Sequence, residues 1–241
     1  MPTPEFDADF DRVALLMHFE GGLADSSSYG HAASAFSGAT LSGAESRFGG
    51  GSIYLPPGGY VRTVNAEALA LSQESWTVEF QIKPLSAADS LWLLGTTAIS
   101  GGGGYHFWMG FQGGRWRWYS NGSEAYVVGP EIQINRWTQV LSRTRTSGSQ
   151  KVRELFIDSS LVYSSTGALG FNMPGPCIWN LGRLPNNFTS TPNPAIYIDD
   201  FRITPGVTRP AEAQTRPFPD GPPPAFVPSA GAAWPAGAVI L

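Results

Sequence analysis

A run of eight residues in the middle of the chain alternates strictly between apolar and polar side chains. The apolar members are Trp76, Val78, Phe80 and Ile82, and the polar members are Thr77, Glu79, Gln81 and Lys83. A period of two places each set on its own face, as in a β-strand with one face against a core and the other toward solvent. Pro84 lacks the N–H that a sheet ladder needs and ends the strand. The sequence therefore predicts a half-buried β-strand over residues 76–83.

Shorter apolar or alternating runs recur along the rest of the chain, with turn residues about every eight to twelve positions, which is typical of an all-β sandwich. The runs cover residues 13–19, 32–41, 52–55, 60–64, 91–94, 105–111, 115–119, 136–143, 152–157, 161–164, 177–182 and 195–203. The 29 glycines and 20 prolines supply the turns. We expect roughly twelve to fourteen strands, one helical turn near residues 66–71 and no long helix.

Charged side chains make up only 14% of the chain, against about 25% in an ordinary globular protein. The net charge is −4 and no basic block occurs, which argues against a nucleic-acid partner. No apolar stretch approaches the roughly 18 residues of a membrane span. Residues 1–5 lack the basic start and apolar run of a signal peptide, so we expect synthesis in the cytoplasm and no membrane partner. The one cysteine, Cys177, cannot form an internal disulfide.

Composition divides the chain into three parts. Residues 1–12 form an N-terminal arm with prolines and acids, residues 13–209 carry the strand pattern, and residues 210–241 form a proline-rich tail. No charged side chain follows Asp220. Disordered tails are normally polar, so this apolar composition predicts that the tail docks on another subunit and becomes ordered there. Its expected anchors are Phe226, Trp234, Ile240 and Leu241.

Four stretches of the chain resemble one family of β-sandwich domains. Residues 13–21 (VALLMHFEG) with 25–27 (DSS) resemble the opening "LLLHFDG…DSSG", and residues 47–52 (RFGGGS) resemble the turn "KFGGGS". Residues 76–83 (WTVEFQIK) resemble the strand "FTIEFWVK", and residues 198–209 (IDDFRITPGVTR) resemble the ending "IDDVRITKGVARY". These are motifs of the laminin-G-like, concanavalin A-like lectin/glucanase jelly rolls.

The joint presence of this opening and this ending is similar to the form common in bacteriophage virion proteins. The resemblance spans about residues 10–210 and implies an all-β, two-sheet antiparallel jelly-roll sandwich that serves as a capsid decoration, fibre or tail component. The chain departs from the family pattern at four positions: Glu20 for Asp, Ser28 for Gly, and the prolines Pro205 and Pro210 within the ending.

The same fold hosts glycoside hydrolases, which need two carboxylates about 5–9.5 Å apart across the scissile bond. Asp199 and Asp200 are adjacent, so a regular strand directs them to opposite faces. Glu154 and Asp158 share a face but lie about 13 Å apart at ~3.3 Å per residue, and Glu79 has no acidic neighbour on its face. We therefore expect no catalytic residues and no enzymatic activity.

The resemblance also suggests a structural calcium ion, because many laminin-G-like domains hold Ca²⁺ between the opening loop and the last strand. Asp25 and either Asp199 or Asp200 match those positions, and their hard oxygen atoms suit Ca²⁺. The alternative is that Asp25 caps a turn through its own backbone and that Asp199 accepts buried hydrogen bonds. No other cofactor is expected.

A predicted hairpin over residues 105–119 carries the candidate ligand site. Alternation places Trp116 and Trp118 on one face and Arg115 and Arg117 on the other. Tryptophan rings stack on sugars and arginines bind acidic groups through paired donors, which favours a saccharide platform. The alternative is that the tryptophans fill the space between two sheets. The candidate ligand-binding residues are Trp108, Arg115, Arg117, Trp118 and Tyr119.

Together these observations favour a non-enzymatic structural or interaction protein of a phage virion, built on a lectin-like sandwich. The alternative function is a carbohydrate-binding module that attaches to host-surface glycans. The expected partners are other virion subunits, reached through the N-terminal arm and the C-terminal tail, and a host glycan. A homo-oligomer located in the virion is expected.

Overall fold

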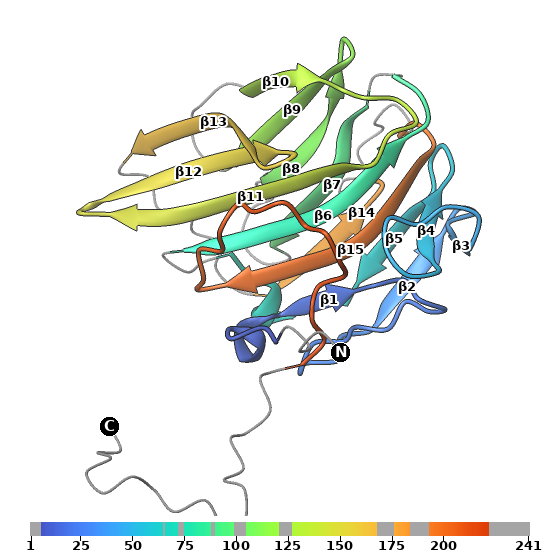
Figure 1. Ribbon diagram of the computed structural model, residues 1–241, viewed down its shortest axis with the longest axis horizontal. Coiled ribbons are helices and arrows are strands. Elements are labelled where there is room, and N and C mark those ends of the chain that lie inside the picture. The colour runs from blue at the N-terminus through green and yellow to red at the C-terminus, as the bar shows by residue number, and fades with distance from the viewer. Residues whose placement is uncertain are drawn as a thin grey trace, which may run out of the picture.

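The computed structural model describes residues 6–64, 66–71, 75–87, 90–98, 105–120, 127–167, 176–183 and 193–221. In these ranges fifteen β-strands form two antiparallel sheets that pack face to face, together with two short 3₁₀ helices (Figure 1). The fold is the predicted all-β jelly-roll sandwich. Among the described residues, no helix has the length and apolar character needed to cross a membrane.

Sheet A has eight strands, and β15 (Ile196–Pro205) is central to it. The order is β13 (Ser160–Gly167), β12 (Gln150–Ile157), β11 (Thr138–Ser147), β6 (Trp76–Pro84), β15, β4 (Ser52–Leu55) and β3 (Thr40–Ser42), and β1 (Leu15–Met17) also pairs with β15. The first half of β15 pairs with β4 and the second half with β1. Between the two halves, its register against β6 shifts from Asp199 to Arg202.

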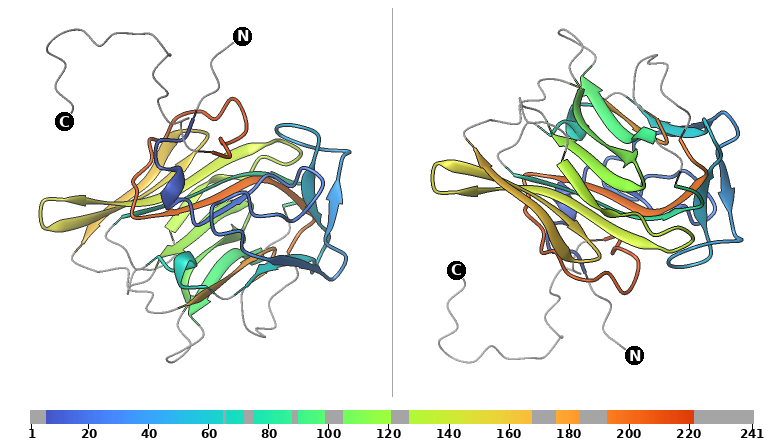
Figure 2. Two further views of the ribbon diagram at one scale, coloured as in Figure 1. Left: turned by 90° about the horizontal axis from the view of Figure 1, so that it is seen from below. Right: turned by 90° about the horizontal axis from the view of Figure 1, so that it is seen from above.

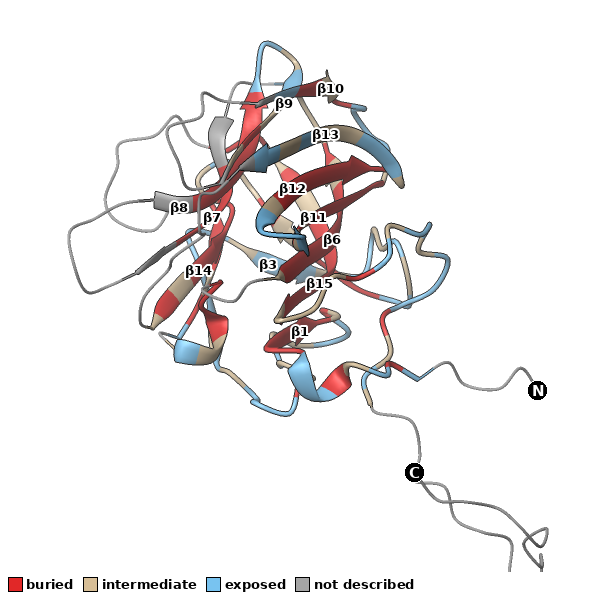
Figure 3. Cartoon of the chain, turned by 90° about the vertical axis from the view of Figure 1, so that its left-hand side faces the viewer, coloured by how far each residue is buried: buried red, intermediate tan, exposed pale blue. Residues whose placement is uncertain are grey.

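Sheet B has seven strands. Their order is β10 (Val127–Glu131), β9 (Arg115–Ser120), β8 (Tyr105–Gln112), β7 (Ser90–Ala98), β14 (Cys177–Leu181), β5 (Tyr60–Thr63) and β2 (Ala33–Phe36). The short helices η1 (Phe10–Arg12) and η2 (Glu67–Leu69) precede β1 and follow β5. Figure 3 shows buried residues along the described strands of both layers.

Large apolar side chains fill the space between the sheets. The apolar face of β6 joins this core as predicted, and the indole of Trp76 meets the ring of Phe107 on β8 edge to face, with centroids 5.7 Å apart. Trp179 on β14 packs against the same Phe107 ring at 5.4 Å. Each buried aromatic side chain removes about 150–250 Å² from water, so this cluster contributes strongly to the free energy of folding.

Each predicted strand overlaps an observed strand, and η2 lies in the predicted helical turn. The prediction of one strand over residues 32–41 is wrong, because a turn at Ser37 and Gly38, both with positive φ, divides this stretch into β2 of sheet B and β3 of sheet A. The prediction missed β10, because Gly129 and Pro130 hide its strand signal. β10 lies at an edge of sheet B, where proline is tolerated because the strand has one side without a ladder partner.

The prediction of a solvent-facing side for β6 is wrong. Thr77, Glu79 and Gln81 on its outer face are 0%, 4% and 1% exposed. Residues 206–221, here called the strap, cross the strands of sheet A over this face (Figures 1 and 2). Residues 6–12 contact the same face beside the strap. Alternation within a strand cannot reveal a cover that comes from the two ends of the described chain.

The packed body therefore extends beyond the predicted limits at residues 13 and 209. Asp7 ahead of the first limit is buried. A small apolar cluster, separate from the main core, joins the two chain ends through Phe10, Val13, Leu16 and Phe218. The predicted tail anchors Phe226, Trp234, Ile240 and Leu241 lie outside the described residues.

Candidate functional site

The outer face of sheet B carries most of the predicted ligand residues. β8 and β9 form a hairpin through Gly113 and Gly114, both with positive φ, and its register places Trp108 opposite Tyr119. These two rings stack with their planes 9° apart and their centroids 5.5 Å apart. Trp108 is 3% exposed and Tyr119 is half-buried, so Tyr119 presents the more accessible ring of the pair.

Two arginines follow Tyr119 back along β9 on the same face. The Arg115 side chain is 47% exposed, donates from Nε to the Gly129 carbonyl at 3.1 Å and lies 3.8 Å from the Glu131 carboxylate. Arg117 is half-buried, and its Nε is buried without a hydrogen-bond partner. The predicted face of Arg115, Arg117 and Tyr119 is therefore the outer one.

Trp118 is not available to a ligand. It is 2% exposed in the core between the sheets, where its ring packs 5.4 Å from that of Tyr163, and Trp116 is 1% exposed in the same core. The alternative interpretation, in which these tryptophans fill the sandwich, is the correct one. Because side chains alternate along a strand, one face of β9 supplies the core, and Trp116 and Trp118 both lie on that face.

The same outer face continues with side chains that the sequence analysis did not single out. Tyr60 on β5 and Phe36 on β2 stack with centroids 4.8 Å apart, and the Arg62 guanidinium lies 5.4 Å from the Tyr60 ring centroid. Arg62 Nε also donates to Asn180 Oδ1 on β14 at 3.2 Å. Alternation in residues 60–63 indicates which of them share a face, but the order of the strands decides that Arg62 and Arg117 lie on one face.

Asp25, a predicted calcium ligand, closes the turn after β1. Its Oδ1 accepts the backbone N–H groups of Leu16 and Ser27, both at 2.9 Å. Its Oδ2 accepts the His31 N–H at 2.8 Å and the Ser27 hydroxyl at 2.9 Å. Four donors use the acceptor capacity of this carboxylate, as in the alternative interpretation of Asp25 as a turn cap.

Asp199 lies where β15 changes its partner from β4 to β1. Its Oδ2 accepts the backbone N–H groups of Arg47 at 2.7 Å and Phe48 at 3.1 Å. Burial raises the pKa of Asp199 to about 6, against the opposing effect of these two hydrogen bonds, and the nearby charge of Asp200 adds to the increase. Asp199 therefore fastens the loop between β3 and β4 to β15.

Asp200 fastens the strap to β15. It lies at the register shift with φ of 51°, accepts the Phe218 N–H at 2.7 Å, and hydrogen bonds with Gln214 Nε2 and His18 Nδ1. Burial lowers the pKa of His18, but its bond to Asp200 and the nearby negative charge, including that of Asp220, outweigh burial and raise it. His18 and Asp200 thus form a latch between β1 and the strap.

The structure does not bring the predicted calcium ligands Asp25, Asp199 and Asp200 together. Within the described ranges, no group of three or more His, Cys, Asp or Glu residues could hold a metal ion. The three carboxylates instead accept hydrogen bonds from different segments: Asp25 from its own turn, Asp199 from the loop before β4, and Asp200 from the strap.

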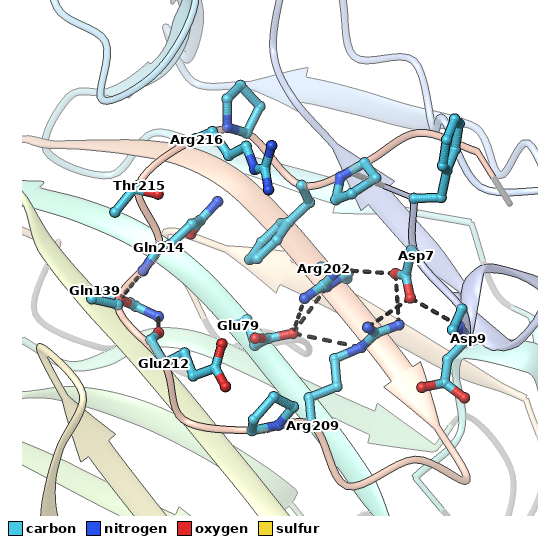
Figure 4. A pocket seen from close by; sticks show the side chains of 17 residues that line it. Asp7, Asp9, Glu79, Gln139, Arg202, Arg209, Glu212, Gln214, Thr215 and Arg216 are labelled. Atoms are coloured by element: carbon cyan, nitrogen blue, oxygen red, sulfur yellow. Dashed lines mark hydrogen bonds and ion pairs between the residues drawn. The ribbon is translucent and has the colours of Figure 1, made fainter. Parts of the chain in front are cut away.

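Two arginines and two acids form a buried ion cluster where the N-terminal segment meets the strap (Figure 4). Arg202 on β15 donates from Nε and Nη2 to Glu79 Oε2, at 2.9 and 2.7 Å, and from Nη1 to Asp7 Oδ2 at 3.0 Å. Arg209 in the strap donates from Nη1 to Asp7 Oδ1 at 2.9 Å. Burial raises the pKa of Asp7, but the hydrogen bond from Arg209 and the charges of both arginines outweigh burial and hold it below its ordinary value.

A cavity of about 430 Å³ lies beside this cluster, between the strap and sheet A. Its lining includes Phe6 and Pro219 from the two ends, Gln139 from β11, and both arginines of the cluster, Arg202 and Arg209 (Figure 4). Because the arginines are paired with Asp7 and Glu79, the cluster fastens the two chain segments to each other and to sheet A.

Polar side chains of sheet A bind the backbone of the strap directly. Gln139 donates from Nε2 to the Glu212 carbonyl at 2.8 Å and accepts the Gln214 N–H at 2.9 Å. Thr77 donates its hydroxyl proton to the Val207 carbonyl at 2.8 Å. Thr77, which the alternation directed toward solvent, and Gln139 therefore satisfy backbone groups of a covering segment.

Comparison with known protein families identifies the sandwich. A model of the concanavalin A-like lectin/glucanases superfamily matches residues 57–214, from β5 into the strap. The chain belongs to this superfamily. None of the curated proteins compared with the chain matches it.

Solved structures of the superfamily fold are similar to the chain at low sequence identity. The binding domain of Paraclostridial Mosquitocidal Protein 1 has a TM-score of 0.63 at 14% identity, over 83% of this chain and 50% of that one. The botulinum neurotoxin type G receptor-binding domain has 0.59 at 16%, over 84% and 49%. Domain 4 of AbnA, a GH43 extracellular arabinanase from Geobacillus stearothermophilus, in complex with arabinotriose, has 0.60 at 16%, over 84% and 98%. The chain thus spans about half of the toxin domains and nearly all of the arabinanase domain.

Proposed function

We propose that this lectin-like sandwich is a non-enzymatic surface module of a phage virion. In this proposal the terminal segments attach it to other virion subunits on the side of sheet A. The opposite side, the outer face of sheet B, then binds a host-surface glycan. The protein would be made in the host cytoplasm and incorporated into the particle as a homo-oligomer.

The observation that carries this proposal is the position of the two chain ends. Phe6 and Pro219 line one cavity on the outer side of sheet A, so the chain enters and leaves the described domain at neighbouring points. The buried pairing of Asp7 with Arg202 and Arg209 fixes both points to the sheet. The Arg115, Arg117 and Tyr119 face lies on the other sheet and points away from them.

Support for the virion context comes from the sequence motifs at residues 13–27 and 198–209, which resemble those of phage virion domains. Support for glycan binding comes from the arabinotriose complex of the similar arabinanase domain and from the half-buried Tyr119 ring and the exposed Arg115 guanidinium on sheet B. The engaged state of the buried carboxylates Asp7, Glu79 and Glu154 supports the absence of enzymatic activity, because each is paired with arginine.

A truncation in the virus that encodes the protein tests the attachment. Removal of residues 222–241 leaves Phe218, the strap and the ion cluster in place, so the domain should keep its melting temperature but fail to enter particles. A truncation from residue 217 is a poorer test, because it also removes Phe218, whose ring lies 3.6 Å from the Arg202 guanidinium carbon. Normal incorporation of the 222–241 deletion would overturn the attachment role.

A glycan array with the full chain tests the second part of the proposal. Binding to at least one glycan should be lost in Tyr119→Ser, which removes the more accessible ring of the stacked pair and leaves the core intact. As a control, Tyr29→Ser removes an exposed tyrosine outside this face and should keep the signal. A signal that is equal in both variants would place the glycan elsewhere.

A further inference from the structure

We infer that the outer face of sheet B recognises an anionic saccharide, one that carries carboxylate or sulfate groups. The inference rests on the proposed glycan binding and names the ligand class. It also assigns two binding residues that sequence analysis did not identify, Arg62 and Asn180.

The strand registers place these residues in one row with the predicted ones. Tyr119 pairs with Trp108, Trp108 with Gly95, Gly95 with Asn180, and Asn180 with Arg62. The row therefore crosses five neighbouring strands, β9, β8, β7, β14 and β5. With about 4.8 Å between adjacent strands, it extends roughly 19 Å from Tyr119 to Arg62. It has a stacked aromatic pair at one end and a guanidinium at the other.

The centre of the row has no side chain. Gly95 lies between Trp108 and Asn180. Gly110, two residues after Trp108 on the same face of β8, pairs with Arg117. Glycine inside a strand weakens it, and it often marks a place where a ligand or another backbone comes close to the sheet. These two glycines are buried, as are Trp108 and Asn180, so the half-buried Tyr119, Arg117 and Arg62 and the exposed Arg115 are the groups of this face that a ligand meets first.

Two N–H donors on this face lack acceptors. Asn180 is 0% exposed, and since its Oδ1 accepts from Arg62, its Nδ2 is the free group and has no hydrogen-bond partner. Arg117 Nε is also buried and unpartnered. A buried donor without an acceptor is unfavourable, because it has lost its hydrogen bonds to water and gained none. A ligand that supplies oxygen acceptors at these two points recovers this free energy.

The charge of the face decides between neutral and anionic sugars. Its charged side chains within the described ranges are Arg62, Arg115, Arg117 and Glu131, with Arg183 beside Tyr60 at its edge. Glu131 is 76% exposed and only 3.8 Å from Arg115, so it neutralises little of the positive charge. The whole chain has a net charge of −4, which makes this face a local exception. A neutral sugar needs acceptors as well as donors, whereas carboxylates and sulfates need donors alone, as arginines provide.

Calorimetric titration of the full chain with three hexasaccharides tests the ligand class. The probes are a heparin-derived one with sulfates, hexagalacturonate with carboxylates, and neutral maltohexaose. At least one anionic probe should bind about tenfold more tightly than the neutral one, which corresponds to one charge-assisted hydrogen bond. Its affinity should fall as ionic strength rises, because salt screens exposed charges.

Three variants test the site, each checked for an unchanged melting temperature. Arg117→Gln removes one charged donor, and Asn180→Asp keeps the acceptor for Arg62 but replaces the free donor with an oxygen. Each should weaken the anionic probe about tenfold. Arg145→Gln removes the same charge from β11 of sheet A, where Arg145 pairs with Glu154, and should leave binding unchanged.

The outcomes separate this inference from the proposed function. Equal affinity for maltohexaose, lost in Tyr119→Ser, would keep glycan binding and overturn the anionic class. Anionic binding unchanged in Arg117→Gln and Asn180→Asp would overturn the site. If the array and all three probes gave no binding, both the inference and the glycan part of the proposed function would fail.

Discussion

Replacing Asp7 with Asn tests whether the buried ion cluster holds the two chain ends on sheet A. The Asp7 side chain is 4% exposed and forms ion pairs with Arg202 at 3.0 Å and Arg209 at 2.8 Å. Asn keeps the shape but removes the charge, so the cluster changes from neutral to +1, with only Glu79 facing two guanidinium groups. An uncompensated buried charge of this kind costs about 3–5 kcal/mol. A domain of ordinary stability has about 5–15 kcal/mol in total, so the loss is large.

Urea denaturation at pH 7, followed by tryptophan fluorescence, measures this loss. Asp11→Asn is the matched control, because Asp11 is exposed in the same segment and its change should stay within about 0.5 kcal/mol. The pKa of Asp7 is lowered in the folded state, so its contribution is present above about pH 4 and is lost as the pH falls through the folded pKa. The difference between wild type and Asp7→Asn should therefore shrink below pH 4. If Asp7→Asn loses no more than Asp11→Asn at pH 7, the cluster does not fasten the chain ends.

Three further predictions concern the core, the latch and the cysteine. Trp118→Ala should lower the free energy of unfolding by about 3–5 kcal/mol, as for a buried aromatic, and a melting temperature close to wild type would contradict its place in the core. The pKa of Asp199 is raised by burial to about 6, and that of His18 is raised by Asp200 although burial opposes it. Deprotonation of Asp199 should therefore lower the free energy of unfolding as the pH rises from about 4 to 6. Deprotonation of His18 should lower it further above about pH 6.5, and this second decrease should be absent in His18→Gln. An unfolding free energy that increases with pH over this range would refute the roles given to Asp199 and His18. Burial raises the pKa of Cys177 to about 11, so a thiol reagent at pH 8 should label it only in denaturant.

The sequence determined the fold class and which residues of a strand share a face. Period-two alternation depends only on the geometry of an extended chain. It therefore correctly placed Trp76 on the core face of β6 and Arg117 on the outer face of β9. It also limited Trp116 and Trp118 to a single common face, although it could not choose between core and platform. The motif at residues 198–209 indicated the family that the match over residues 57–214 then confirmed.

The tertiary structure decided what covers each face. The hydrogen bond between Asp7 and Arg202 joins residues 195 positions apart, and no local pattern carries such a pairing. The outer face of β6 is polar in sequence because it binds the strap and the ion cluster, whereas alternation alone assigned it to water. Asp199 and Asp200 likewise serve the junction of β4, β1 and the strap, a role that exists only once β15 has changed its partner.

The candidate site follows the same division. Alternation identified Arg115, Arg117 and Tyr119 because they are two residues apart on one strand. Arg62 and Asn180 join them only through the order β9, β8, β7, β14 and β5, which hydrogen bonding between distant segments creates. Which way a side chain points is a property of a few consecutive residues, whereas which side chains become neighbours depends on how the whole chain packs.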